Sequence, residues 1–360
     1  MREQANGGGR NAPVRFLLAG AGLIGRRHAA AIAGARGVAL AAVVDPDPAA
    51  REVADRYGTD WWPTLDAALA AAGADAALLA TPNQYHAEGA LLTIGTGLPT
   101  LVEKPFVTSV AEGRGVVEAA EAADVPLAVG HHRRHNLIIA AAKAAIEAGR
   151  IGRPVAAHVT AWMMKPRDYF ATAWRREPGG GPVAINLIHE IDVLRYLCGP
   201  VAEVAAMTSN AARGHAVEDT AVVSLRFVSG ALGTLTVSDT AVAPWSWELT
   251  AGENPAYPTT GETNAMIAGT RGSIAVPGLA VWEQDEGEGW WNPIRASHAP
   301  RGGGDGHADP LVRQVEQFAA VARGEAEPLA SGRDGLAAIA VIEAIHRSAR
   351  DGRTATVESA

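Results

Sequence analysis

The sequence predicts an α/β protein that begins with a doubly wound parallel sheet, and three observations support this prediction. Short apolar runs alternate with alanine-rich helical stretches from about residue 14 to about residue 130. The first run leads directly into a glycine-rich turn and then into a helix. Later runs end in short polar segments, at the edge of such a sheet where ligands bind.

Length and composition set the outer limits. The chain has 360 residues, more than one ordinary core holds, so we predict a disordered tail at 1–13, a first domain at 14–130 and a second at 131–360. The formal net charge of −8 disfavours a nucleic-acid-binding protein. We find neither a signal peptide nor a membrane-spanning run, and we expect a cytoplasmic location.

The first glycine turn has the form of a phosphate-binding loop. The strand predicted at Val14–Ala19 runs into Gly20-Ala21-Gly22-Leu23-Ile24-Gly25, and a helix follows. Gly20 allows a tight turn, Gly22 lets the backbone approach a pyrophosphate, and Gly25 lets the helix pack closely on the strand. The free N–H groups at the helix N-terminus then favour an anion. This pattern predicts a Rossmann domain.

An acidic residue strengthens this prediction. The next strand, Val38–Val44, ends at Asp45, about 20 residues after the last glycine, where a dinucleotide fold places the acid that binds the adenosine ribose. No lysine or arginine adjoins Asp45 to hold a 2′-phosphate, so we expect NAD rather than NADP. Two further strands end in polar motifs, Thr81–His86 and Glu103-Lys104-Pro105.

The motifs GAGLIG, TPNQYH and EKP, in that order and spacing, resemble the Gfo/Idh/MocA family of oxidoreductases. The resemblance runs from about Val14 to about Val357 and includes the segments GHHRRHN and WRREPGGGP. It implies a second, α+β domain with a large, open, mostly antiparallel sheet. The sequence agrees with predicted strands at 155–162, 202–209, 220–228, 232–239 and 246–250, and with predicted helices at 185–197, 311–321 and 335–349. An exposed apolar sheet face would need a partner, which favours a homodimer or homotetramer.

Two residues fit the chemistry of oxidising a secondary alcohol, which needs a base for the hydroxyl proton and a cation for the developing alkoxide. Lys104 fits the second role, and the resemblance implies that it contacts both the substrate hydroxyl and the cofactor. His189 fits the first, because histidine exchanges protons near neutral pH. The family usually has an aspartate four residues before this histidine, whereas this chain has Ile185 there. Asn186, three residues before, would share the helix face of His189, and Asp192 is an alternative partner for His189.

The other candidates are weaker. Arg133 or Arg134 lines the pocket by resemblance, although a salt-bridging pair is an equal alternative. Lys165, Tyr169, Trp174 and Arg175 are suited to binding and stacking on a sugar ring. His131, His132 and His135 cluster without a cysteine or carboxylate, so no metal site is predicted. The candidate cofactor-binding residues are Gly20, Gly22, Leu23, Ile24, Gly25, Asp45, Thr81, Asn83, His86, Glu103 and Lys104.

Three functions remain open at this point. The first is an NAD-dependent dehydrogenase that acts on a cyclic polyol, a sugar or a sugar-like acid. The second is a redox-neutral enzyme of the same fold, in which NAD transiently oxidises a sugar so that a glycosidic bond breaks. The third is a non-catalytic nucleotide sensor, against which the presence of Lys104 and His189 argues.

Overall fold

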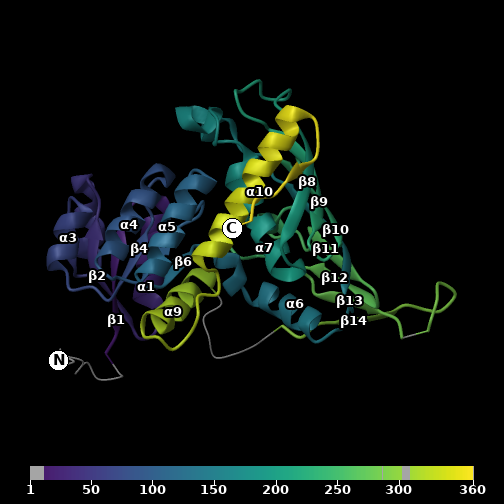
Figure 1. The fold of residues 1–360 in the computed structure, drawn as a ribbon, viewed down its shortest axis with the longest axis horizontal. Coiled ribbons are helices and arrows are strands. Elements are labelled where there is room, and N and C mark those ends of the chain that lie inside the picture. Colours follow the sequence, from purple (N-terminus) through teal and green to yellow (C-terminus); the bar gives the residue numbers. More distant parts are fainter. Residues whose placement is uncertain (1–11, 286, 302–308, 360) are drawn as a thin grey trace. The chain divides into compact units, whose positions relative to one another are not determined.

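The computed structural model describes residues 12–285, 287–301 and 309–359. The predicted disordered tail lies outside the described residues except for its last two positions. The chain forms two compact units, and each is considered by itself (Figure 1). The first consists of Met1–His132 and His307–Gly332, and the second of Arg133–Gly306 and Arg333–Ala360.

The first unit contains a six-stranded sheet in which every pairing is parallel, which confirms the predicted doubly wound fold. The chain begins at a central strand, runs outward to one edge, and then returns to the other side of that strand. The order is β3-β2-β1-β4-β5-β6, so the switch point lies between β1 and β4. The strands are β1 (Val14–Ala19), β2 (Val38–Val44), β3 (Asp60–Trp62), β4 (Ala76–Leu79), β5 (Thr100–Val102) and β6 (Leu127–Val129).

Helices connect these strands, as right-handed crossovers require. Side-chain caps start two of them: the Thr64 hydroxyl accepts a hydrogen bond from the Ala67 N–H, and the Ser109 hydroxyl accepts one from the Glu112 N–H. The helices are α1 (Leu23–Gly34), α2 (Arg51–Arg56), α3 (Leu65–Ala71), α4 (His86–Gly95) and α5 (Val110–Ala122), with short 3₁₀ turns at Pro48–Ala50 and Asn83–Tyr85.

A helix distant in sequence completes the first core. Helix α9 (Pro310–Ala322) belongs to the first unit, whereas the predicted domain boundary placed this segment with the second. Its apolar side buries Leu311, Val315 and Phe318 against β1, and the Phe318 ring lies 6.2 Å from that of Phe16. The amphipathic pattern predicted the helix correctly, but such a pattern does not identify the surface that the apolar side covers.

The second unit contains a nine-stranded, mostly antiparallel sheet, as the resemblance implied. Its only parallel pair, among the described residues, joins β7 to β10, so these two strands end at the same edge. In spatial order the strands are β14 (Arg295–His298), β13 (Ala280–Glu283), β12 (Gly272–Val276), β11 (Ala265–Gly269), β7 (Pro154–Trp162), β10 (Leu232–Ser238), β9 (Thr220–Phe227), β8 (Val201–Ser209) and β15 (Ala355–Thr356).

One predicted strand is wrong, and four strands were missed. The segment Ser246–Thr250 forms the short helix α8 (Trp247–Thr250), in which Trp247 and Thr250 are buried three residues apart. An alternating pattern of five residues does not exclude this helical spacing. Strands β11 to β14 escaped the sequence analysis because they are short, rich in alanine and glycine, or polar, as in the RASH of β14.

The second sheet has one covered and one open face. Figure 1 shows α6 (Leu137–Glu147), α7 (Ile188–Cys198) and α10 (Gly332–Asp351) on one side of it. The strand register places the exposed side chains Met207, Val222, Met266 and Trp282 together on the other face. An apolar open face of this kind is a candidate interaction surface.

Candidate active site

The glycine turn after β1 has the geometry that its motif predicts. Gly20 has a φ of +90°, and a Cβ there would lie 2.5 Å from the Ala80 carbonyl oxygen. A Cβ on Gly25 would lie 1.9 Å from the Gly20 carbonyl oxygen, so both positions exclude any larger residue. A Cβ on Gly22, by contrast, would point into open space with no atom within 4 Å. The space at Gly22 is therefore available to a ligand.

The N-terminus of α1 is also open to an anion. Gly22 caps the helix without a side-chain hydrogen bond, which leaves the first N–H groups of α1 to a ligand or to water. Leu23, the first residue of the helix, is 87% exposed, and Ile24 is half-buried. An exposed leucine beside free N–H groups suits a ligand that has both phosphate and apolar parts. The turn therefore fits a dinucleotide.

Asp45 lies at the carboxyl end of β2, beside this turn. Its carboxylate accepts hydrogen bonds from the backbone N–H groups of Ala21 (2.8 Å) and Asp47 (2.9 Å). These bonds fix the carboxylate against the glycine turn, while each oxygen keeps a further acceptor position. The position matches the expectation that Asp45 binds a ribose.

The two later motifs are tied to each other by His86. Its Nδ1 lies 2.8 Å from the Pro105 carbonyl oxygen, and its Nε2 lies 2.8 Å from the Thr81 carbonyl oxygen. The ring is buried, so it connects the loop after β4 to the loop after β5. Asn83, which begins the 3₁₀ turn before α4, is half-buried. His86 thus has a defined contribution to loop shape, whereas its contact with a cofactor stays a prediction.

Lys104 follows a buried ion pair that the sequence analysis did not identify. Glu103 Oε1 lies 2.6 Å from His28 Nε2, and Glu103 Oε2 accepts the Lys104 backbone N–H at 2.9 Å. A Cβ on Gly130 would lie 2.9 Å from the Glu103 carboxylate, so this glycine makes room for it. The half-buried Lys104 therefore has its backbone fixed by the preceding carboxylate.

The electrostatics of this pair favour a charged Glu103. Burial would raise its pKa, but the hydrogen bond and charge of His28, with the charges of Lys104 and His132, outweigh burial and lower the pKa to about 2. His28 lies on the buried side of α1, one turn after Gly25. A histidine on an apolar helix face was the available sequence signal, but its partner is 75 residues away in the chain.

In the second unit, both candidate arginines are paired with carboxylates. Arg133 donates to Glu190 (2.5 Å) and to Glu248 (2.8 Å). Arg134 donates to both oxygens of Asp192 and to Asp334 (3.1 Å). The ion-pair alternative is therefore realised for both, and substrate binding by the buried Arg133 stays a prediction. Asp192, considered above as a partner for His189, is bonded to Arg134 instead.

These pairs hold the helix that carries His189. Burial would lower the pKa of Arg133, but the charges of Glu190 and Glu248 outweigh burial and raise it. Burial raises the pKa of Glu190, and the charge of Arg133 opposes that rise. Glu190 and Asp192 follow His189 on α7, so two buried ion pairs fix this part of the helix. His189 itself is 8% exposed.

The backbone before His189 differs from the prediction. Residues Val183–Leu187 form a π-helical turn, and the α-helix begins only at Ile188. A π turn has i→i+5 hydrogen bonds, so the expectation that Asn186 shares a face with His189 through α-helical spacing does not hold across it. The Glu218 carboxylate accepts the Val183 N–H (3.0 Å) and lies against Gly181, where a Cβ would be 2.2 Å away. Single π turns are frequent at functional sites.

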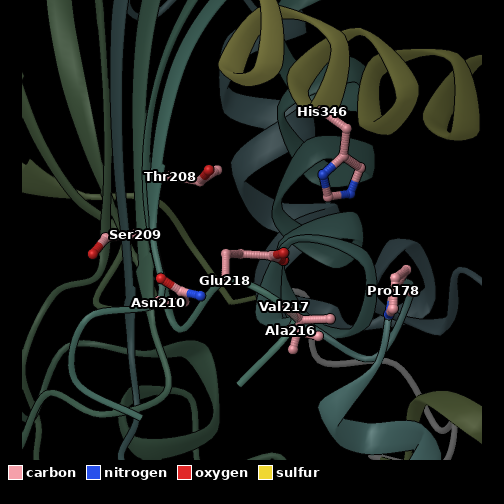
Figure 2. A pocket seen from close by; sticks show the side chains of 9 residues that line it. Pro178, Thr208, Ser209, Asn210, Ala216, Val217, Glu218 and His346 are labelled. Carbon is pink, nitrogen blue, oxygen red and sulfur yellow. The ribbon is translucent and has the colours of Figure 1, made fainter. Parts of the chain in front are cut away.

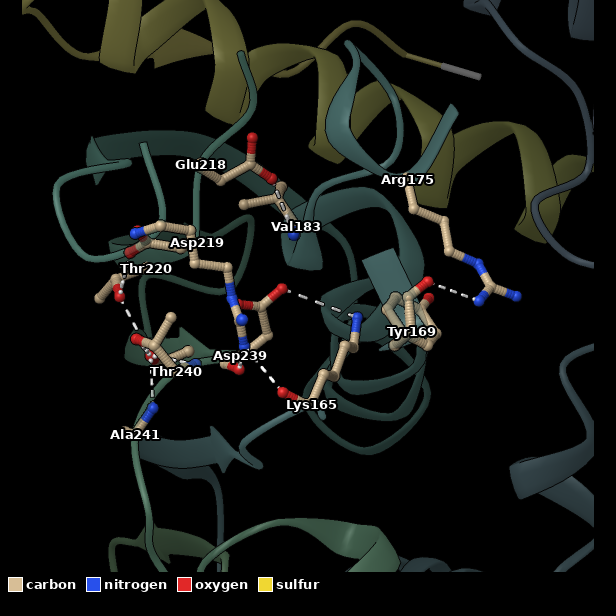
Figure 3. Close-up of polar contacts among 12 residues, drawn as sticks. Lys165, Tyr169, Arg175, Val183, Glu218, Asp219, Thr220, Asp239, Thr240 and Ala241 are labelled. Atoms are coloured by element: carbon tan, nitrogen blue, oxygen red, sulfur yellow. Dashed lines mark hydrogen bonds and ion pairs between the residues drawn. The ribbon is translucent and has the colours of Figure 1, made fainter. Parts of the chain in front are cut away.

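Lys165, Tyr169 and Trp174 lie near one another in the second unit (Figure 3). Lys165 Nζ is 4.7 Å from the centroid of the Tyr169 ring and 4.0 Å from Asp239 Oδ2. Arg175 lies 4.0 Å from the centroid of the same ring and 5.5 Å from that of Trp174. Lys165 follows β7 and Asp239 follows β10, which are the two parallel strands. The structure thus brings these predicted residues together.

A separate cavity in the second unit includes none of the predicted site residues (Figure 2). Its volume is about 440 Å³, and its polar walls come from β8, from the segment before β9 and from α10. Glu218 connects it to the π turn through the bond to Val183. The lining residues are Pro178, Gly179, Thr208, Ser209, Asn210, Ala216, Val217, Glu218 and His346.

Two searches of the described residues gave no positive result. Within 12–285, 287–301 and 309–359, no group of three or more His, Cys, Asp or Glu side chains is arranged to hold a metal ion. Among the helices of the same residues, none is long and apolar enough to span a membrane.

The fold and the glycine turn define a dinucleotide-binding protein of the oxidoreductase type. The family described as "Oxidoreductase family, NAD-binding Rossmann fold" matches residues 14–131, and "Oxidoreductase family, C-terminal alpha/beta domain" matches residues 143–358. The chain belongs to the Gfo/Idh/MocA family of oxidoreductases. The expected class, a dehydrogenase acting on CH–OH groups, is confirmed at the level of this family.

Individual relatives agree with the family. The chain is 30% identical to the inositol 2-dehydrogenase of Rhizobium meliloti, with 96% of this chain and 99% of the relative covered. It is 28% identical to a D-apiose dehydrogenase of Paraburkholderia graminis, with 95% and 89% covered. The WlbA dehydrogenase of Bordetella pertussis, solved with NADH and UDP-GlcNAcA, is 30% identical, with 97% and 100% covered and a TM-score of 0.77.

Proposed function

We propose that the protein is an NAD-dependent dehydrogenase that oxidises a secondary alcohol of a cyclic polyol, a sugar or a sugar-like acid. The observation that carries this proposal is the Lys104 backbone, held by the buried Glu103–His28 pair two strands from the glycine turn. An ammonium group at the carboxyl end of β5 suits a role next to a bound nicotinamide. The names of the relatives, which act on inositol and apiose, support the same class of substrate.

The cofactor would be held by the first unit. The N–H groups of α1 would bind the pyrophosphate, with Gly20, Gly22 and Gly25 shaping the turn, and Leu23 and Ile24 would supply apolar contact. Asp45 would accept the ribose hydroxyls and would repel a 2′-phosphate, which favours NAD over NADP. Thr81, Asn83, His86, Glu103 and Lys104 would shape and line the nicotinamide end.

The chemistry divides between two side chains. When bound, NAD supplies the acceptor for the hydrogen that leaves the substrate carbon. The Lys104 ammonium would donate a hydrogen bond to the substrate hydroxyl oxygen and stabilise its negative charge. His189 would accept the hydroxyl proton, and Arg133 would hold α7 through Glu190. Asn186, Lys165, Tyr169 and Trp174 would orient the substrate.

Turnover with a substrate panel tests this proposal. Purified protein would be mixed with NAD or NADP and with cyclitols, aldoses and sugar acids, and reduced nicotinamide would be followed by absorbance. We expect reduction of NAD with one substrate class and at least about 100-fold slower turnover for Lys104→Ala, with NADH affinity changed by less than about tenfold. Undiminished turnover by Lys104→Ala would refute the assigned role.

A second copy of the chain is the proposed partner of the open sheet face. The side chains that share this face, including Met207, Val222 and Met266, would then be buried in a homodimer or homotetramer. Light scattering at micromolar concentration tests this, and a monomeric mass would refute it. The cytoplasmic location stays a prediction, which cell fractionation would test.

A further inference from the structure

The cluster around Tyr169 has more positive than negative charge. Three cations lie in it: Lys165, Arg175 and Arg213. Arg213 donates to Asp239 at 2.7 Å, and Lys165 Nζ lies 4.0 Å from the other oxygen of the same carboxylate. One buried carboxylate is therefore shared by two cations, and both are themselves largely buried.

A second carboxylate, Asp219, is already engaged. It accepts the backbone N–H groups of Ala212 and Arg213, both at 2.9 Å, and the Thr220 hydroxyl at 2.9 Å. Even when Asp219 is included, three cations face two carboxylates, so one positive charge is not balanced within the cluster. Burying a surplus charge is costly unless a ligand compensates it.

Arg175 is where the surplus charge is located. Nη1 of Arg175 donates to the Tyr169 carbonyl oxygen (2.8 Å), and its Nε is buried with no hydrogen-bond partner among the described residues. No described carboxylate lies within 4 Å of its guanidinium, and the nearby Asp168 and Glu177 are exposed and do not pair with it. The guanidinium stacks on the Tyr169 ring, and Figure 3 shows Lys165 and Arg175 extending from different sides of that residue.

Tyr169 adds a neutral donor and a flat surface. Burial raises the pKa of Tyr169, and the charges of Asp239 and Tyr257 raise it further, while Arg175 opposes the rise. The side chain therefore keeps its O–H at neutral pH. A phenol face with cations beside it can stack on a sugar ring while the cations bind an attached anion.

We propose that the substrate is a sugar acid, whose carboxylate is bound by Arg175 together with Lys165 while its ring lies against Tyr169. This inference rests on the proposed function and narrows its substrate class. A carboxylate has one negative charge and a planar edge that matches the guanidinium in a bidentate contact. A phosphate has close to two charges at neutral pH, more than this cluster compensates. Arg175 is thus a specificity-determining residue.

The test compares substrates that differ in one group. Initial rates of NAD reduction would be measured with D-glucuronate, D-glucose and D-glucose 6-phosphate, and with D-galacturonate and D-galactose, at constant ionic strength. We expect a higher kcat/KM for the acid than for the matched neutral sugar and the phosphate. Arg175→Met should lower the acid-to-neutral ratio by about 10- to 100-fold, which is the usual effect of one charge-assisted hydrogen bond.

Two further variants sharpen the comparison. Arg176→Met removes an exposed cation from the next position, which has no contact with Tyr169, and it should keep the wild-type ratio. Arg175→Lys keeps the charge without the planar fork and should give an intermediate ratio. A wild-type preference for the neutral sugar or the phosphate, or an unchanged ratio in Arg175→Met, would overturn the inference.

A binding measurement separates this inference from the proposed function. If no sugar reduces NAD, calorimetric titration of D-glucuronate and D-glucose into the NADH-saturated protein gives the answer without turnover. Binding of the glucuronate that weakens in Arg175→Met but not in Arg176→Met would support the carboxylate site, although the dehydrogenase assignment had failed. Absent or equal binding of the two sugars would overturn it.

Discussion

The two units fix their functional residues by different means. In the first, the backbone dominates: Gly20 and Gly25 admit no side chain, and the Asp45 carboxylate is held by backbone N–H groups. In the second, long side chains dominate: Arg133 and Arg134 bind four carboxylates that lie between 57 and 200 residues away. A site that binds one invariant cofactor can be made from backbone, whereas side-chain networks can change with the substrate.

Loss of a buried ion pair should have the largest effect on stability, and it should be specific to the second unit. Arg133→Met leaves Glu190 and Glu248 without their shared cation, and we expect the free energy of unfolding to fall by about 3 to 5 kcal/mol. Urea denaturation followed by circular dichroism measures this. Arg226→Met, which breaks the exposed pair with Glu203, should cost less than about 1 kcal/mol. Equal losses in the two variants would contradict the comparison.

The exception in the first unit is the Glu103–His28 pair, and pH reveals it. The pKa of Glu103 is about 2 in the folded chain against an ordinary 4.5, so its stabilisation is complete above pH 4.5 and disappears as the pH falls toward 2. Glu103→Gln should therefore be less stable than wild type at pH 7 by on the order of 3 kcal/mol. The difference should shrink in denaturation curves taken between pH 5 and pH 3. A difference that stays constant over that range would show that the carboxylate charge is not responsible.

The smallest of the three effects tests the backbone turn without disturbing the fold. Gly22→Val places a side chain in the open space beside the α1 N-terminus, and we expect NADH affinity to fall about 100-fold with little change in thermal stability. Fluorescence titration of NADH measures the affinity. Gly34→Val makes the same change at the other end of α1, where a Cβ also meets nothing within 4 Å, and should bind NADH normally. Wild-type affinity in Gly22→Val would refute the pyrophosphate position.

The sequence predicted most of the first unit because its signals are local. A strand, a glycine turn and a helix occupy consecutive residues, and the spacing to Asp45 is short enough to recognise. The second unit was predicted less completely. Strands β11 to β14 lack strong alternation, and the π turn before His189 has no sequence signature, so the spacing argument for Asn186 was wrong across it.

By itself, the sequence determined the class of fold, the glycine turn, Asp45 and the identity of Lys104 and His189 as candidates. Only the tertiary structure decided what surrounds them: His28 beneath Glu103, the carboxylates of Arg133, and Arg175 stacked on Tyr169. The physical reason is distance along the chain. Local motifs express backbone conformation, which depends on neighbouring residues, whereas a buried charge is defined by its partner, and that partner arrives from a remote element only when the chain folds.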